Sequence, residues 1–135
     1  MAIALLDCRL LPGWAIERWI AEVRRIINDD TIKIEVVLNF ATPESPLGTT
    51  LHAAIGRAVK QLYPAAGLAE SPSTGFNDSH WFREKGIVSY GFVPFALKDS
   101  ELLGVHGNDE RIPLKAYTDG VRLEWEVVYS FCHSQ

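Results

Sequence analysis

His106 lies between two glycines, Gly104 and Gly107, and is followed by Asp109 and Glu110. Glycines let the backbone bend tightly and bring an imidazole into a cleft, where it can act as a metal ligand or a general base. A carboxylate such as that of Glu110 can then hold the imidazole in one tautomer. A loop histidine that simply pairs with a carboxylate accounts for the same spacing, so both interpretations stay open on the residues alone.

A second group of polar residues falls where a turn leads into a helix. The segment 73–80 contains a glycine turn followed by Asn77, Asp78 and His80. Backbone N–H groups at a helix N-terminus, together with these side chains, can bind the carboxylate of a substrate. The alternative is that Asp78 only caps the helix.

Several functional classes are excluded by pattern and composition. The sequence has neither an HExxH pair nor a GxSxG elbow, and neither cysteine stands in a visibly electropositive setting. The net charge of −4 argues against a nucleic-acid partner. The first apolar stretch, 2–6, is far shorter than the roughly 20 residues of a membrane span. Because no basic region of a signal peptide precedes Asp7, we expect a cytoplasmic protein that does not enter the membrane.

The elements that must position these residues alternate between strand and helix patterns. Apolar runs and period-two alternation predict strands over 3–10, 32–39 and 87–93. Helical spacing of apolar residues predicts helices over 16–27 (Ile16, Ile20, Val23, Ile27) and 114–131 (Leu114, Tyr117, Val121, Trp125, Val128). A helix over 50–63 is bounded by Thr49 or Thr50 and Pro64, and a short helix over 79–85 is bounded by Asp78 and Gly86. This order predicts an α/β (α+β) fold. A strand placed at the first residues of the chain needs a partner for its backbone groups, which suggests that upstream sequence has been lost.

The segment 41–48 is rich in proline, serine and threonine and ends in glycine. This composition is typical of a hinge or linker. We therefore expect 41–48 to separate two unequal parts of the chain.

Three stretches match a known family in order and spacing. They are Leu6-Asp7-Cys8-Arg9-Leu10-Leu11-Pro12-Gly13, then 73–86 running into Tyr90-Gly91-Phe92, and Val105-His106-Gly107-Asn108-Asp109-Glu110-Arg111-Ile112. Over nearly its whole length the chain resembles the C-terminal part of the zinc metallopeptidases that include acetylornithine deacetylase, succinyl-diaminopimelate desuccinylase, aminoacylase and the glutamate carboxypeptidases.

The resemblance implies a domain arrangement and an activity. Residues 1–40 would be the second half of a lid domain that mediates dimerisation, 41–48 the hinge, and 49–135 the C-terminal segment of the catalytic domain. Intact members use two zinc ions to hydrolyse the amide bond of N-acyl amino acids or small peptides. His106 matches the last zinc ligand of the family, carried on an H-G-x-x-E loop whose glutamate is Glu110 here.

The sequence also departs from the family pattern. The family's H-x-D motif, bridging aspartate and paired glutamates are not in this sequence, and one histidine cannot hold two zinc ions. His80 stands where relatives carry an arginine, whose bidentate fork it lacks. We therefore expect no catalysis by this chain alone, and either a homodimer or an N-terminal portion as its partner. The alternative is a non-catalytic α/β interaction or dimerisation module.

Overall fold

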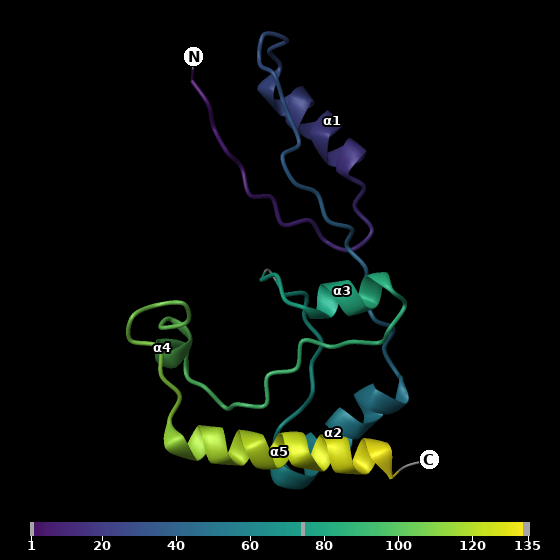
Figure 1. The fold of residues 1–135 in the computed structure, drawn as a ribbon, viewed down its shortest axis with the longest axis vertical. Helices are drawn as coiled ribbons and strands as arrows, with labels where there is room; N and C mark the ends of the chain where they lie inside the picture. Colours follow the sequence, from purple (N-terminus) through teal and green to yellow (C-terminus); the bar gives the residue numbers. More distant parts are fainter. Residues whose placement is uncertain (1, 74, 134–135) are drawn as a thin grey trace. The chain divides into compact units, whose positions relative to one another are not determined.

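The structure is a computed structural model that describes residues 2–73 and 75–133 (Figure 1). Its helices are α1 (Ile16–Ile27), α2 (Thr50–Leu62), α3 (Ser79–Glu84), α4 (Asp99–Leu102) and α5 (Leu114–Cys132). Two compact units make up the chain. Unit 1 contains residues 1–45 and 72–91, and unit 2 contains residues 46–71 and 92–135.

Helix α1 in unit 1 confirms the predicted helix and its face. Ile16, Ile20, Val23 and Ile27 are each partly covered, whereas Ile26, on another side of the helix, is exposed. The helix ends at Asn28, which adopts a left-handed conformation (φ 48°) and donates its N–H to the carbonyl of Arg24. Asparagine tolerates this conformation better than most residues, which explains why the helix stops here.

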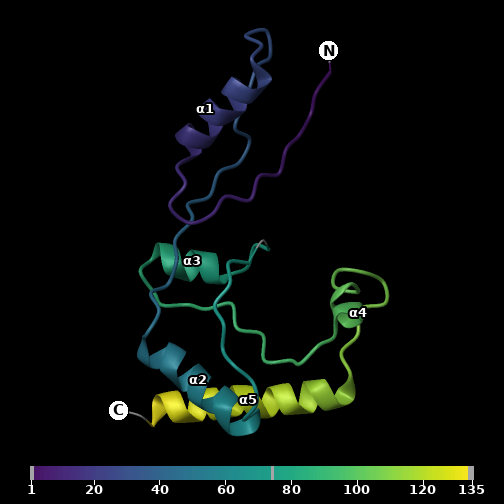
Figure 2. The same ribbon diagram turned by 180° about the vertical axis from the view of Figure 1, so that it is seen from behind.

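Helix α2 in unit 2 begins where the sequence predicts. The hydroxyl oxygen of Thr49 accepts a hydrogen bond from the backbone N–H of His52 at 3.1 Å, which caps the first turn. The helix packs beside α5, as both ribbon views show (Figures 1 and 2). The buried apolar residues of the described chain all come from this pair: Ala54, Ile55, Ala58, Val59, Ala116, Leu123 and Val127.

Helix α5 is confirmed, but its buried face is not the one formed by its large residues. Small and aliphatic side chains face α2, and at Gly120 the ring of Phe95 comes so close that a Cβ would lie 2.6 Å from its Cε1. The larger apolar residues of the spacing pattern are exposed: Leu114, Tyr117, Val121, Trp125 and Val128. The missing side chain of Gly120 leaves room for the Phe95 ring, which fits this face of α5 to the core.

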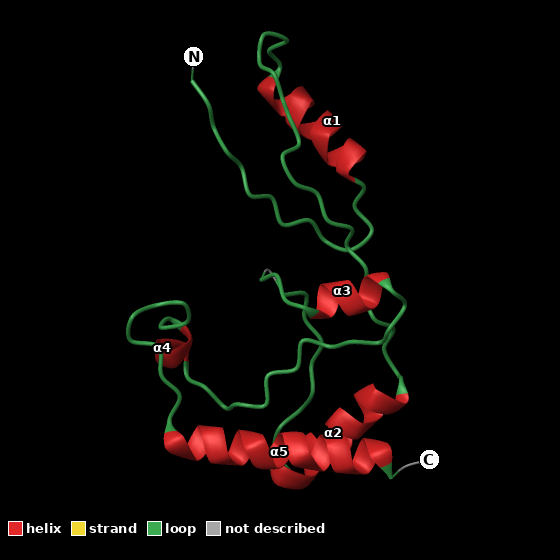
Figure 3. Cartoon of the chain, viewed as in Figure 1, coloured by secondary structure: helices red, strands yellow, loops and turns green. Residues whose placement is uncertain are grey.

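The predicted strands do not form among the described residues, so the structure does not confirm an α/β fold (Figure 3). Segments 3–10, 32–39 and 87–93 are not paired as strands, and Ile3 and Leu5 are each 82% exposed. A strand requires backbone partners on a neighbouring strand. At Ser89 the backbone is bonded differently, because Ser45 Oγ accepts from its N–H and donates to its carbonyl oxygen, both at 2.9 Å.

No helix in the described ranges combines the length and apolar character needed to cross a membrane. One boundary between the compact units falls at Ser45/Pro46, inside 41–48. The assignment of 1–40 and 49–135 to a lid and a catalytic domain stays a prediction.

Candidate functional site

His106 occupies the third position of a tight turn in unit 2. The turn is closed by the N–H of Gly107, which donates to the carbonyl oxygen of Gly104 at 2.8 Å. His106 itself has a positive φ of 63°. This position of a type II turn requires positive φ, and it is usually filled by glycine or asparagine. The strained residue is therefore the histidine itself. The sequence had suggested instead that Gly104 and Gly107 would allow the backbone to turn.

The turn presents the His106 imidazole to solvent. The residue is exposed, and its ring makes no hydrogen bond within the described part of the chain. Glu110 is also exposed, and its backbone N–H donates to the carbonyl of Gly107 at 3.4 Å. Its carboxylate makes no hydrogen bond to the imidazole, so its role in orienting His106 stays a prediction.

The described residues do not assemble a metal site around His106. Within residues 2–73 and 75–133, no group of three or more His, Cys, Asp or Glu side chains is arranged to hold a metal ion. Zinc in proteins takes three or four protein ligands. The donor set therefore does not fit a complete zinc site, and His106 offers a single nitrogen donor.

The segment that precedes α3 in unit 1 is capped by a different residue from the one expected. Asn77 Oδ1 accepts a hydrogen bond from the N–H of Ser79 at 3.1 Å, whereas Asp78, the residue before the helix, makes no side-chain cap. Both side chains are exposed. The Asp78 carboxylate is therefore not used as a cap. Thr74, in the same segment, lies outside the described residues.

His80 is the buried polar residue of this segment, at 6% exposure. Its ring lies within 5.4 Å, centroid to centroid, of the rings of Phe40, Phe76 and Trp81, and these four rings all contact one another. The cluster joins α3 to the end of the extended segment 32–40. The sequence placed His80 on a substrate surface and did not indicate this aromatic environment.

The Nε2 atom of His80 is buried without a hydrogen bond. Oε1 of Glu84, one helical turn further on, lies 3.2 Å away. This separation is an ion-pair distance, although no hydrogen bond joins the two atoms. Sequence reasoning missed Glu84, although the i, i+4 spacing on a helix was the available signal.

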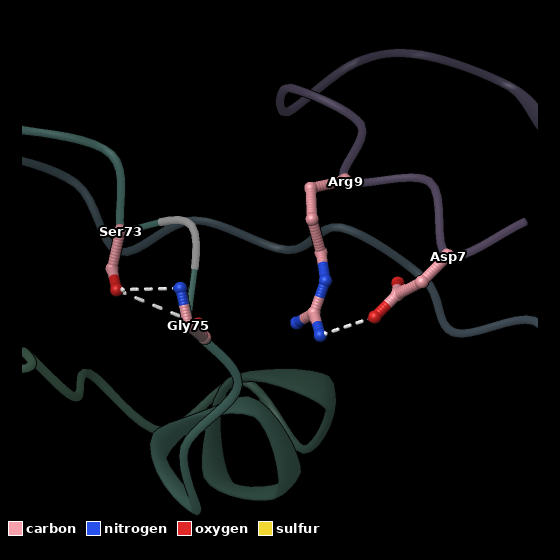
Figure 4. A network of polar contacts seen from close by, with 4 residues as sticks. All are labelled: Asp7, Arg9, Ser73 and Gly75. Atoms are coloured by element: carbon pink, nitrogen blue, oxygen red, sulfur yellow. Dashed lines mark hydrogen bonds and ion pairs between the residues drawn. The ribbon is translucent and has the colours of Figure 1, made fainter. Parts of the chain in front are cut away.

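Two further polar contacts lie in the stretches that carried the resemblance (Figure 4). Arg9 Nη2 and Asp7 Oδ2 are 2.7 Å apart, and both side chains point to the same side of the extended chain, as alternate residues do. Ser73 Oγ accepts from the N–H of Gly75 at 3.1 Å. This bond shapes the turn that leads toward Asn77. His106 and Glu110 belong to the other compact unit.

Comparison with known proteins finds relatives that match almost the whole chain. The chain is 28% identical over 129 positions to a protein of Dictyostelium discoideum named "Probable carboxypeptidase S-like 2", with 94% of this chain and 25% of the relative covered. It is 25% identical over 135 positions to the human "N-fatty-acyl-amino acid synthase/hydrolase PM20D1", and 26% identical over 136 positions to the protein of that name from Bos taurus.

Each of the latter two matches covers 95% of this chain and 26% of the relative. No family model and no solved structure matches the chain. The chain thus spans about a quarter of the length of the curated relatives it matches. These matches confirm the resemblance that the three sequence stretches indicate, because the chain is similar over nearly its whole length to one part of a carboxypeptidase-like protein and of N-fatty-acyl-amino acid synthase/hydrolases.

Proposed function

We propose that this chain is part of a zinc-dependent hydrolase that cleaves the amide bond of N-acyl amino acids or small peptides. The observation that carries the proposal is the end-to-end match with about a quarter of a carboxypeptidase-like protein and of N-fatty-acyl-amino acid synthase/hydrolases. Both names describe chemistry at an amide bond beside an amino acid. In this proposal the chain alone does not turn over substrate.

His106 serves as one metal ligand in this enzyme. Its exposed imidazole, free of hydrogen bonds and set at a positive φ, supports the assignment, because strained residues cluster at functional sites. Glu110 would orient the ring once further ligands are in place. Those ligands come from another polypeptide segment that carries the family's H-x-D and paired-glutamate motifs. No catalytic step through zinc follows from the residues of this chain.

Asn77, Asp78 and His80 contribute to the substrate cleft. His80 Nε2 is buried without a hydrogen bond, although Glu84 Oε1 lies 3.2 Å away, and a buried polar atom in this state supports a polar role for the residue. Asp78 carries an exposed carboxylate that the helix does not use as a cap. Together they offer polar contacts to a small substrate.

The finer architecture belongs to the same proposal. Residues 1–40 form half of a dimerising lid, 41–48 form the hinge, and 49–135 complete the catalytic domain. The extended segments 3–10, 32–39 and 87–93 become strands when they pair with the rest of the enzyme, which gives the α/β fold. The assembly is cytoplasmic.

Complementation tests the proposal. The chain is co-expressed with a polypeptide that carries the remaining three quarters of a relative, and the purified assembly is assayed for hydrolysis of an N-acyl amino acid and for bound zinc. We expect activity with two zinc ions per assembly, and loss of at least one zinc ion together with activity in His106→Ala. His133→Ala, at the other end of unit 2, is the matched control and should change neither value. An assembly in which His106→Ala keeps both zinc ions and full activity would contradict the proposal.

A second candidate is a non-catalytic interaction module, which is favoured by the incomplete donor set and by the packed α2–α5 pair. Zinc titration of the assembly with the complementing polypeptide separates the two, because a single histidine in the chain alone does not make a zinc site. Stoichiometric binding at micromolar zinc that is lost in His106→Ala supports a retained metal site. A flat titration of both the chain and its assembly supports the module.

A further inference from the structure

Helix α5 carries a second apolar surface that the chain leaves uncovered. Five large side chains form it, which we call the α5 stripe: Leu114, Tyr117, Val121, Trp125 and Val128. Leu114 is 78% and Trp125 64% exposed, and the other three are about half exposed. The face that packs on α2 uses different residues of the same helix. Within the stripe, Tyr117 stacks on the ring of Phe95 at 6.1 Å between centroids and remains half exposed.

The spacing of the α5 stripe is the same in both directions. From Leu114 the intervals are three, four, four and three residues, which places Val121 at the centre. A second copy that lies antiparallel therefore sets Leu114 against Val128 of the other copy, Tyr117 against Trp125, and Val121 against itself. A twofold interface requires such a self-complementary surface. Antiparallel helices also oppose their dipoles favourably.

The stripe is large enough for a stable pair. A buried aromatic side chain covers about 150 to 250 Å², and Tyr117 and Trp125 expose 51% and 64% of their surface. With the aliphatic residues and the neighbouring Tyr129, the exposed surface is on the order of 600 Å² per copy, so its complete burial in a dimer would cover about 1,200 Å², the lower end of specific interfaces. Packing at 8 to 10 Å between helix axes is compatible with side chains of this size.

We propose that the α5 stripe is a homodimer interface, in which α5 pairs antiparallel with α5 of a second copy about a twofold axis at Val121. This interface is separate from the lid pairing suggested by the family resemblance, because it uses residues 114–128. It also does not depend on the chain being part of a hydrolase.

Sedimentation equilibrium of the full chain tests the proposal first. We expect a dimer that dissociates in the micromolar range. Val121→Glu places two carboxylates against each other at the axis and should weaken the dimer at least 100-fold. Arg122→Glu introduces the same side chain at the neighbouring exposed position outside the stripe and should have less than a fivefold effect. Far-UV circular dichroism of both variants checks that α5 persists.

Cysteine cross-linking gives the orientation without depending on a disruptive variant. In a Cys8→Ser, Cys132→Ser background, single Val121→Cys, Leu114→Cys and Val128→Cys variants are treated with a short bismaleimide. We expect Val121→Cys to cross-link to itself, and Leu114→Cys to cross-link to Val128→Cys in a mixture but not to itself.

Three results would overturn the proposal. They are a monomer at all concentrations up to the millimolar range, association that Val121→Glu leaves unchanged, and Leu114→Cys joining to itself more efficiently than to Val128→Cys. The last result would indicate a parallel pair or a contact elsewhere.

Discussion

One hydroxyl group, that of Ser45, satisfies both backbone hydrogen-bonding groups of Ser89, 44 residues away. The side chain thus takes the position that a neighbouring strand would occupy. Arg83 Nη1 also donates to the Ser89 carbonyl, at 3.0 Å, and ties α3 to the same point. Among the described residues of unit 1, this connection joins segments that are not paired in a sheet.

Removal of this hydroxyl should destabilise unit 1. We expect Ser45→Ala to cost about 1 to 2 kcal/mol in the free energy of unfolding, because it leaves a part-buried N–H without its partner. Hydrogen exchange of the Ser89 amide should accelerate in parallel. Ser89→Ala is the matched control, since both bonds use the backbone of Ser89, and it should change stability by less than about 0.5 kcal/mol. Equal losses in the two variants would show that the hydrogen bonds contribute little.

Substitution by alanine should have opposite effects on the free energy of unfolding at Gly120 in α5 and at Gly56 in α2. Gly120→Ala brings a Cβ within 2.6 Å of Phe95 Cε1 and 3.1 Å of the Pro94 carbonyl, so overpacking should outweigh the gain in helix propensity and cost about 1 to 3 kcal/mol. Gly56→Ala meets only Leu68 Cδ2 at 3.9 Å and should gain about 0.5 to 1 kcal/mol. Thermal melts of both variants measure the difference, and a stabilising Gly120→Ala would mean that α5 does not approach Phe95 this closely.

His106→Gly should raise the free energy of unfolding while it removes the imidazole that we propose as a metal ligand. Glycine adopts a positive φ without the steric cost of a Cβ, and the relief should exceed its greater unfolded-state entropy, giving a net gain of up to about 1 kcal/mol. His106→Ala keeps the strain and should gain nothing. Denaturant unfolding of His106→Gly and His106→Ala measures the free energy of unfolding of each variant. The difference between them gives the effect of backbone strain, because both variants lack the imidazole. If glycine and alanine variants are equally stable, the backbone at 106 is not strained.

The stability that the Asp29–Thr31 hydrogen bonds give to the end of α1 should depend on pH. The hydroxyl of Thr31 donates to Asp29 Oδ1 at 2.7 Å and its backbone N–H donates at 2.9 Å, and these bonds hold the pKa of Asp29 below its ordinary value. A lowered folded-state pKa means that the stabilisation is fully present above the unfolded pKa of about 3.9 and is lost as the pH falls through the folded value. Thr31→Val should therefore lower the melting temperature at pH 7 but not at the acid end of the titration. Asp29→Asn should abolish this difference.

The cap of α3 provides a test of residue roles. Asn77→Ala removes the acceptor of the Ser79 N–H and should cost about 0.5 to 1 kcal/mol, more than Asp78→Ala. Asn77→Asp retains an acceptor and should preserve stability. The ranking of the three melting temperatures is the measurement. If Asp78→Ala lowers the melting temperature more than Asn77→Ala does, Asp78 is the residue that caps α3.

Local signals in the sequence predicted α1, α2, α3 and α5, whereas the four-residue helix α4 lies in a stretch without clear periodicity and was not predicted. Apolar spacing located α1 and α5, and Thr49 and Pro64 marked the ends of α2. These features act within a few residues of the chain, so no distant partner is needed to form them. Strand formation over 3–10 or 87–93 depends instead on partners elsewhere, and periodicity does not supply them.

The candidate site was predictable only in part, for the same reason. The turn at His106 is local, and its glycines indicated a tight bend, but only the structure shows that the histidine itself takes the left-handed conformation. The environment of His80 depends on Phe40, which is 40 residues away in the chain. Such a long-range contact leaves no spacing signal.

Helix α5 is apolar on two sides, so hydrophobicity by itself does not determine how the helix is rotated about its axis. The absent side chain at Gly120 does, because only this rotation admits the Phe95 ring against the backbone. The glycine therefore determines which face of α5 is buried. A larger residue at position 120 would displace the Phe95 ring and weaken the preference for this rotation.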